Sequence, residues 1–144
     1  MDQNDTAKLL KECNAGIKMC VTSIDEVLDH VKNQELRNTL TKNKEEHQKL
    51  GSKTHELLNS HEETGKEPSA MAKGMSWIKT NAMLSMDESD STVADLITDG
   101  CNMGVKSLNR YLNKYKSADE KSKDIAKKLI DLEHELTLDM RQYL

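Results

Sequence analysis

Only one proline, Pro68, interrupts the 144 residues, and long stretches on either side of it carry apolar residues at every third or fourth position. This spacing places apolar side chains on one face of an α-helix, and proline is the residue that most strongly breaks a helix. Hydrophobic residues make up 35% of the chain and aromatic residues 3%, with no phenylalanine. The core must therefore consist of Leu, Ile, Val, Ala and Met, a mixture that favours helices over sheets. The chain is predicted to be all-α.

The apolar stripes predict four long helices, at about residues 5–32, 34–61, 90–116 and 120–143. Asn33 is predicted to separate the first two helices. Asp90 or Ser91 is predicted to cap the third. The fourth is predicted to open with a capping box of the form Ser-x-x-Glu, from Ser117 to Glu120.

The first two helices and the last two are each joined by only a few residues, which predicts two antiparallel hairpins. Between the hairpins, the segment EETGKEPS is a predicted loop, and a shorter helix is predicted from just past Ser69 to about Met86. This connection is long enough to run the length of a helix, and one long crossover is the connectivity of ferritin-like bundles. The predicted fold is a ferritin-like four-helix bundle, a single domain over residues 1–144 with a long helical crossover.

The net charge of −4 supplies no long-range attraction to nucleic acid or to an anionic bilayer. No stretch approaches the roughly 20 apolar residues of a spanning helix, and the start MDQNDTAKLL lacks the basic and hydrophobic regions of a signal peptide. Three cysteines without a CxxC pair fit reduced thiols better than a disulfide framework. We therefore expect a cytoplasmic protein that binds neither nucleic acid nor membrane.

Three segments carry a family resemblance: GKEP at 65–68, MAKGMSWIKTN at 71–81 and DGCNMGVKSLNRYL at 99–112. With them the chain, from about Leu36 to its end, resembles an uncharacterised bacterial branch of the ferritin-like superfamily, small four-helix-bundle proteins of unknown function. The resemblance implies the fold. Because the biochemical role of that branch is not settled, it transfers little function.

Ferritin-like proteins often hold two iron ions through Glu-x-x-His pairs, since residues three apart share a helix face. No Glu in this chain has a His three residues later. The nearest form is Asp131 with His134, which is predicted to point to the flank of its helix, and Val105 stands where related proteins carry an acidic residue. A di-iron oxidase-type enzyme is therefore the last of three interpretations.

Four side chains of metal-ligand type fall near the middle of the predicted bundle: Cys20, His47, Cys101 and Glu133. Counted from the first interhelical turn, Cys20 lies 13 residues back and His47 lies 14 residues on, and counted from the last turn Cys101 and Glu133 each lie 16 residues away. Two thiolates, an imidazole and a carboxylate suit zinc, iron or another divalent ion. The simpler interpretation is that the cysteines are small buried hydrophobes and that His47 is a neutral imidazole bonded to Asn43 or Glu133.

The second predicted helix is unusually polar. Glu45 and Glu46 lie among lysines, and we expect them on the surface, with Glu45 paired to Lys49. On the predicted inner face, Asn43 and Thr54 could fix the register of the helices or contact a second subunit. We therefore expect a homo-oligomer.

The crossover is rich in side chains that form either an adaptable partner surface or a face that packs on the bundle. They are Met71, Met75, Trp77, Met83 and Met86. Gly100 and Gly104 remove side chains from one face of the third helix, so that another group can approach closely. Trp77 is predicted to fill this groove.

No phosphate-binding glycine loop, GxSxG, CxxC or HExxH occurs in the sequence, so nothing in it demands catalysis. The first hypothesis is a non-enzymatic binding or assembly protein that has lost the metal ligands of its relatives and binds no cofactor. The alternative is a protein that stores or senses a divalent ion through Cys20, His47, Cys101 and Glu133.

Overall fold

The structure, a computed structural model, describes residues 3–61 and 87–144. Within these residues the long helices are α1 (Gln3–Leu28), α2 (Gln34–Ser60), α4 (Asp90–Lys114) and α5 (Glu120–Met140), and the short 3-10 helix η1 (Arg141–Tyr143) follows. The prediction of an all-α four-helix bundle is confirmed. The crossover residues singled out in the sequence lie outside the described residues: Met71, Met75, Trp77, Met83 and Met86.

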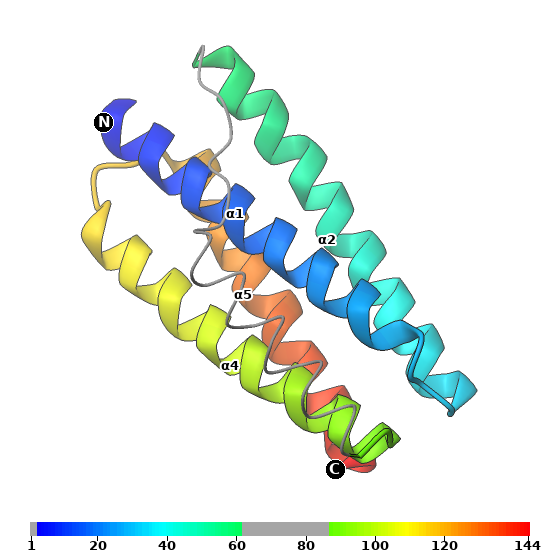
Figure 1. Ribbon diagram of the computed structural model, residues 1–144. Helices are drawn as coiled ribbons and strands as arrows, with labels where there is room; N and C mark the ends of the chain where they lie inside the picture. The colour runs from blue at the N-terminus through cyan, green and yellow to red at the C-terminus, as the bar shows by residue number, and fades with distance from the viewer. Residues whose placement is uncertain (1–2, 62–86) are drawn as a thin grey trace.

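The four helices form two antiparallel hairpins, α1 with α2 and α4 with α5 (Figure 1). Helix α1 packs against α2 and α4, and α5 packs against the same two helices, so α2 and α4 lie diagonally across the bundle. Helix α2 ends at the opposite end of the bundle from the start of α4, and these two helices run in the same direction. The hairpins are therefore arranged as the prediction of a long connection requires.

Each of the last three long helices begins at a residue whose side chain accepts a hydrogen bond from the backbone of the first turn. Asn33 accepts from the amide of Leu36, as the predicted break at Asn33 suggests. Helix α4 is capped by Ser89 and not by Asp90 or Ser91, and α5 is capped by Asp119. The predicted capping box from Ser117 is therefore wrong, because Asp119 lies closer to the first turn and its carboxylate caps equally well.

The turns at both ends of the bundle are tied to a neighbouring helix. The Asp90 carboxylate accepts hydrogen bonds from the amides of Lys32 and Asn33 at 2.8 and 3.0 Å, which joins the α1–α2 turn to the start of α4. At the other end, the amide of Asp119 donates to Thr6 Oγ1 at 2.8 Å. These bonds fix the relative heights of the four helices, which decides which side chains meet at mid-bundle.

Helix α1 ends at Leu28, earlier than predicted. The guanidinium of Arg37 donates to the carbonyl oxygens of Leu28 and Val31, at 3.2 and 2.6 Å. The Leu28 carbonyl also accepts a hydrogen bond from the amide of Val31, at 3.3 Å, in the turn that follows the helix. Arg37 therefore takes the place of a further helical turn.

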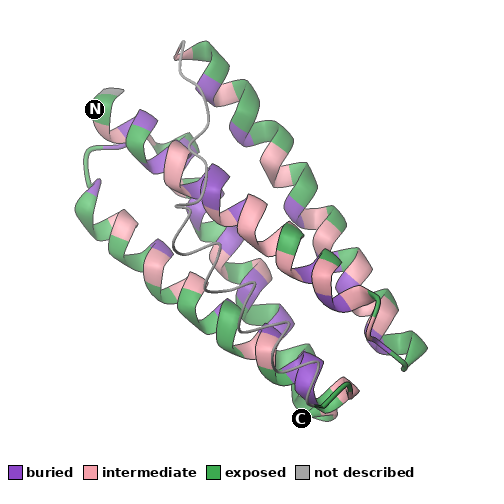
Figure 2. Cartoon of the chain, viewed as in Figure 1, coloured by how far each residue is buried: buried purple, intermediate pink, exposed green. Residues whose placement is uncertain are grey.

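Most of the buried apolar residues form two clusters, one toward each end of the bundle, and buried positions face the neighbouring helices (Figure 2). The Leu136 cluster consists of Ile24, Val27, Val31, Leu36, Leu40, Val93, Ala94, Ile97, Cys101, Leu136 and Met140. The Leu129 cluster consists of Leu9, Leu10, Cys13, Ile17, Leu58, Leu108, Tyr115, Ala118, Ile125, Ala126 and Leu129. Between them in sequence, on three helices, lies a set of polar residues that we call the polar layer: Cys20, Asn43, His47 and Glu133.

Candidate metal centre

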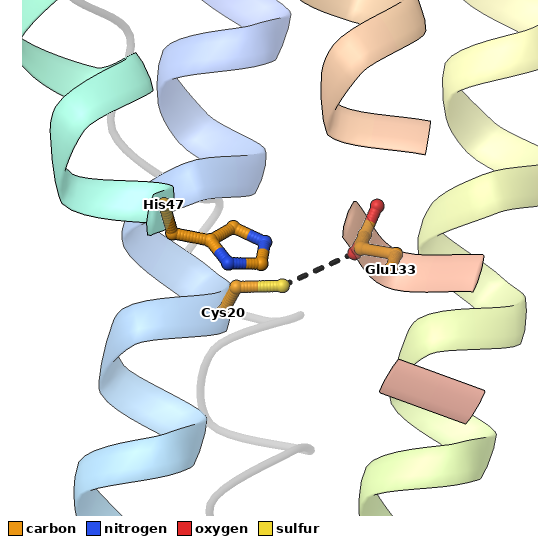
Figure 3. A group of neighbouring side chains, drawn as sticks. All are labelled: Cys20, His47 and Glu133. Carbon is orange, nitrogen blue, oxygen red and sulfur yellow. Dashed lines mark hydrogen bonds between the residues drawn. The ribbon is translucent and has the colours of Figure 1, made fainter. Parts of the chain in front are cut away.

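Three helices each contribute one side chain to the polar layer at a single point. Cys20 comes from α1, His47 from α2 and Glu133 from α5, and the three side chains point toward one another (Figure 3). Their potential ligand atoms all lie within 4.8 Å of one another. His47 and Glu133 are 0% and 3% exposed, and Cys20 is half-buried with its sulfur turned inward. A thiol, an imidazole and a carboxyl group thus meet inside the bundle.

His47 presents an unpartnered nitrogen to this point. Its Nδ1 lies 3.0 Å from the backbone carbonyl oxygen of Asn43. Because a carbonyl oxygen only accepts, we infer that Nδ1 carries the hydrogen and that Nε2 has the free lone pair. Burial lowers the pKa of His47 and so favours the neutral ring. Nε2 is buried and has no hydrogen-bond partner, which is the state in which imidazole binds a metal.

Cys20 and Glu133 are bonded to each other. The Cys20 thiol donates to Glu133 Oε1 at 3.1 Å, while Oε2 is buried without a partner. Burial raises the pKa of Glu133 to about 7, and the bond from Cys20 opposes this rise. Burial, followed by the nearby charges of Glu133 and Cys101, raises the pKa of Cys20 well above its ordinary value. In the metal-free protein, both acids therefore resist the loss of their protons.

Asn43 fixes the position of α2 relative to α5. Its side-chain nitrogen donates to the backbone carbonyl of Leu132 at 3.2 Å, one residue before Glu133. Its carbonyl Oδ1 is buried without a partner. Thr54, the other polar residue on this face, donates to Leu50 in its own helix at 2.7 Å. Asn43 therefore links the helices that carry His47 and Glu133, whereas the bond from Thr54 stays within α2.

Gly104 of α4 lies directly against the Glu133 carboxyl group. A Cβ atom built on Gly104 would lie 2.8 Å from Glu133 Cδ and 2.9 Å from Oε2, and closer still to Oε1. The small residue on this face of α4 therefore accommodates a carboxyl group. The predicted occupant, Trp77, lies outside the described residues. The sequence signal for this contact was a glycine inside a helix, where glycine lowers stability.

The fourth predicted ligand, Cys101, is set apart from the other three. It is buried in the Leu136 cluster and is not in the group whose ligand atoms lie within 4.8 Å of one another. Cys101 is close enough for its charge to raise the pKa of Cys20. Burial, with a smaller effect of Glu133, raises the pKa of Cys101 itself to about 12. Three of the four predicted residues thus meet, and the fourth lies beside them.

Other polar groups considered in the sequence lie on the surface. Asp131, His134 and Glu45 are exposed, so the nearest form of the di-iron motif does not reach the interior. Within α2, Lys49 forms an ion pair with Glu46, at 3.2 Å, and not with Glu45 as predicted. Spacings of three and four residues both bring side chains together on a helix, and here the shorter spacing is used.

No protein-family model matches the chain, and no similar curated protein or solved structure was found. Membership of the ferritin-like superfamily therefore stays a prediction. Within residues 3–61 and 87–144, no helix is both long enough and apolar enough to cross a membrane. Self-association, cytoplasmic location and the lack of nucleic-acid binding also stay predictions.

The polar layer has the donor set of a metal centre. Sulfur, imidazole nitrogen and carboxylate oxygen are the three ligand types that zinc takes in proteins. The buried Nε2 of His47 and Oε2 of Glu133 have no protein partner, and such atoms are uncommon in folded proteins because burial without a bond lowers stability. A bound cation would satisfy both.

Proposed function

We propose that this protein binds one divalent transition-metal ion, with zinc as the preferred ion, through Cys20, His47 and Glu133. The observation that carries the proposal is the meeting of three ligand atoms within 4.8 Å inside the bundle, two of the residues having a buried polar atom without a partner. The protein is a carrier, store or sensor of the ion and not an enzyme.

The balance of charge supports a divalent ion. When Cys20 and Glu133 lose their protons they supply two negative charges, and His47 binds as a neutral ring. A doubly charged cation makes the site neutral, which a buried layer tolerates far better than a net charge. The ion would thus balance the negative charges of Cys20 and Glu133, two acids whose pKa values are raised in its absence.

The separations also fit a small ion. Zinc–ligand bonds of about 2.0–2.3 Å place tetrahedral ligand atoms about 3.3–3.8 Å apart. The sulfur of Cys20 and Oε1 of Glu133 are already 3.1 Å apart, and the remaining separations, up to 4.8 Å, close with small side-chain rotations. Three protein ligands leave one position for a fourth ligand. Water in that position keeps the site neutral, whereas the Cys101 thiolate would give it a net charge of −1.

We also propose that the bundle is a ferritin-like one whose usual acidic ligands are replaced. The parallel course of α2 and α4 supports a long crossover of that kind. In place of paired Glu-x-x-His motifs, the interior offers one ion a mixed set of sulfur, nitrogen and oxygen. Iron is the second candidate ion, because it accepts the same ligands.

The test is zinc binding to untagged protein, measured by competition with a coloured chelator and by mass spectrometry of the purified protein. We expect one zinc per chain, and loss of that zinc in Cys20→Ala and His47→Ala. Cys13→Ala is the matched control for the thiol, because Cys13 is buried in the same helix within the Leu129 cluster. His134→Ala, an exposed histidine next to Glu133, is the control for the imidazole.

Cobalt binding tests the ligand types directly. Co²⁺ substituted for zinc shows sulfur-to-metal absorption that disappears in Cys20→Ala and persists in Cys13→Ala. A smaller decrease in Cys101→Ala would identify Cys101 as the fourth ligand. If the wild-type protein binds no zinc at micromolar concentration, or if both controls lose zinc along with the ligand variants, the proposal is wrong.

A further inference from the structure

The Glu133 carboxyl group lies against α4 at Gly104, the position where α4 has no side chain. Any side chain at position 104 would overlap this group, since a Cβ atom there would lie 2.8 Å from Cδ and 2.9 Å from Oε2. Real Cβ contacts essentially never fall below 3.0 Å. The position of the carboxyl group thus depends on the absence of a side chain on a different helix.

We propose that Gly104 is a positioning residue of the metal centre, whose lack of a side chain leaves the space in which the Glu133 carboxyl group lies beside both Cys20 and His47. The inference rests on the proposed function and adds a residue that binds no metal itself. It assigns to α4 a role in a centre whose three ligands come from α1, α2 and α5.

The neighbouring glycine shows that the contact is specific to one position. Gly100 lies four residues earlier on α4, and a Cβ atom built there would meet nothing within 4 Å. Both glycines weaken the helix relative to alanine. Only Gly104 has a neighbour that explains its presence, so Gly100 is a matched control in the same helix.

The overlapping atoms belong to the end of a flexible side chain and not to the backbone. An alanine at position 104 would therefore displace the Glu133 carboxyl group by rotation of its side chain, and the bundle would keep its fold. The bond from the Cys20 thiol to Oε1, now 3.1 Å long, would be broken. The centre would be left with sulfur and imidazole and without a correctly placed oxygen.

The experiment compares the zinc affinities of four variants with that of wild-type protein: Gly104→Ala, Gly100→Ala, Glu133→Ala and the double variant Gly104→Ala/Glu133→Ala. We expect Gly104→Ala to weaken zinc binding by about 10- to 100-fold, the usual effect of altering a residue that orients a ligand. Gly100→Ala should change the affinity by less than about twofold. In the absence of the Glu133 carboxyl group, Gly104→Ala should have no further effect, because the two positions act through one contact.

Two results would overturn the inference. One is wild-type affinity in Gly104→Ala. The other is an equal weakening by Gly104→Ala with and without the Glu133 side chain, which would indicate a general disturbance of α4. If wild-type protein itself binds no zinc, the proposed function fails, and a crystal structure of metal-free Gly104→Ala then decides the positioning role alone. Retention of the bond between Cys20 and Glu133 in that crystal structure would count against it.

Discussion

Helix α5 carries two kinds of interior on the same face. Leu129, Glu133 and Leu136 follow one another at spacings of four and three residues, and all three are at most 3% exposed. Burial of each leucine stabilises the fold by about 1.5–3 kcal/mol. Burial of Glu133 has the opposite effect, because it raises the pKa of the carboxyl group to about 7. The apolar clusters therefore hold the bundle together, while the polar layer lowers its stability in the absence of a ligand.

The difference between the clusters and the polar layer indicates that the functional site lies in the polar layer. Groups with shifted pKa values inside a protein gather at functional sites more often than elsewhere. Here the buried Glu133 carboxyl group lies between two apolar clusters. The turns at both ends of the bundle are held to neighbouring helices by hydrogen bonds. Such a frame holds ligand atoms in place before the ion arrives, which reduces the free energy needed to assemble a site.

The largest expected effect concerns the polar layer, and it is the pH dependence of zinc binding. Zinc must displace the proton of Cys20 at any pH near neutrality, and below about pH 7 also that of Glu133. As pH is lowered, the zinc affinity should fall. The decrease should be about tenfold for each pH unit above about pH 8, and it should approach a hundredfold for each unit below about pH 6. Lowering the pH from 8 to 6 should therefore weaken zinc binding about a thousandfold in total. Competition titrations in buffers across this range measure it.

A control variant separates the contributions of Cys20 and Glu133 to this pH dependence. In Glu133→Gln the affinity is weaker throughout, but its pH dependence should keep the single-proton slope of about tenfold per unit down to about pH 6. An unchanged steep slope in this variant would show that some other group supplies the second proton. The layer would then not be the origin of the pH dependence.

The next largest effect belongs to the apolar side of the comparison. Leu129→Ala should lower the free energy of unfolding by about 2–5 kcal/mol, the usual result of leaving a cavity in a packed core. The decrease should be the same with and without zinc, because Leu129 lies in an apolar cluster and contributes no ligand atom. Urea unfolding of both forms measures it. A decrease that disappears when zinc is added would show that the clusters and the layer do not act independently.

The arrangement of a polar layer between two apolar clusters was predictable from the sequence in part, because helical periodicity is a local property. The stripes identified four helices, and counting from the turns placed Cys20, His47, Cys101 and Glu133 near mid-bundle. The contact between Gly104 and Glu133 was not predictable, since it depends on the axial shift between α4 and α5. Cys101 was counted to the same level as Glu133, yet its thiol belongs to the Leu136 cluster. Counting along a helix fixes height to within about one turn, whereas ligand contact requires agreement to a fraction of one.

The third prediction tests whether Glu133 lowers stability in the metal-free protein. Its pKa is raised from 4.5 to about 7 by folding, so the folded state holds the proton more tightly and stability is lost as pH rises through this range. The shift corresponds to about 3 kcal/mol. In the presence of a chelator, Glu133→Gln should therefore become more stable relative to wild type between about pH 4.5 and pH 7. Urea unfolding at a series of pH values measures the difference, and a constant difference would contradict the prediction.

The smallest effect is expected from a charged pair on the surface of the helix that carries His47. Glu46 precedes His47 in the sequence, and its carboxylate lies 3.2 Å from the Lys49 ammonium group, with 42% and 75% of the two side chains exposed. Water screens such a pair, so Glu46→Gln should change the free energy of unfolding by less than about 1 kcal/mol. Zinc affinity should also stay unchanged, because the carboxylate is not in the group of ligand atoms. A marked loss of zinc in Glu46→Gln would move the centre from the interior to the surface of α2, since one residue along a helix turns a side chain by about 100°.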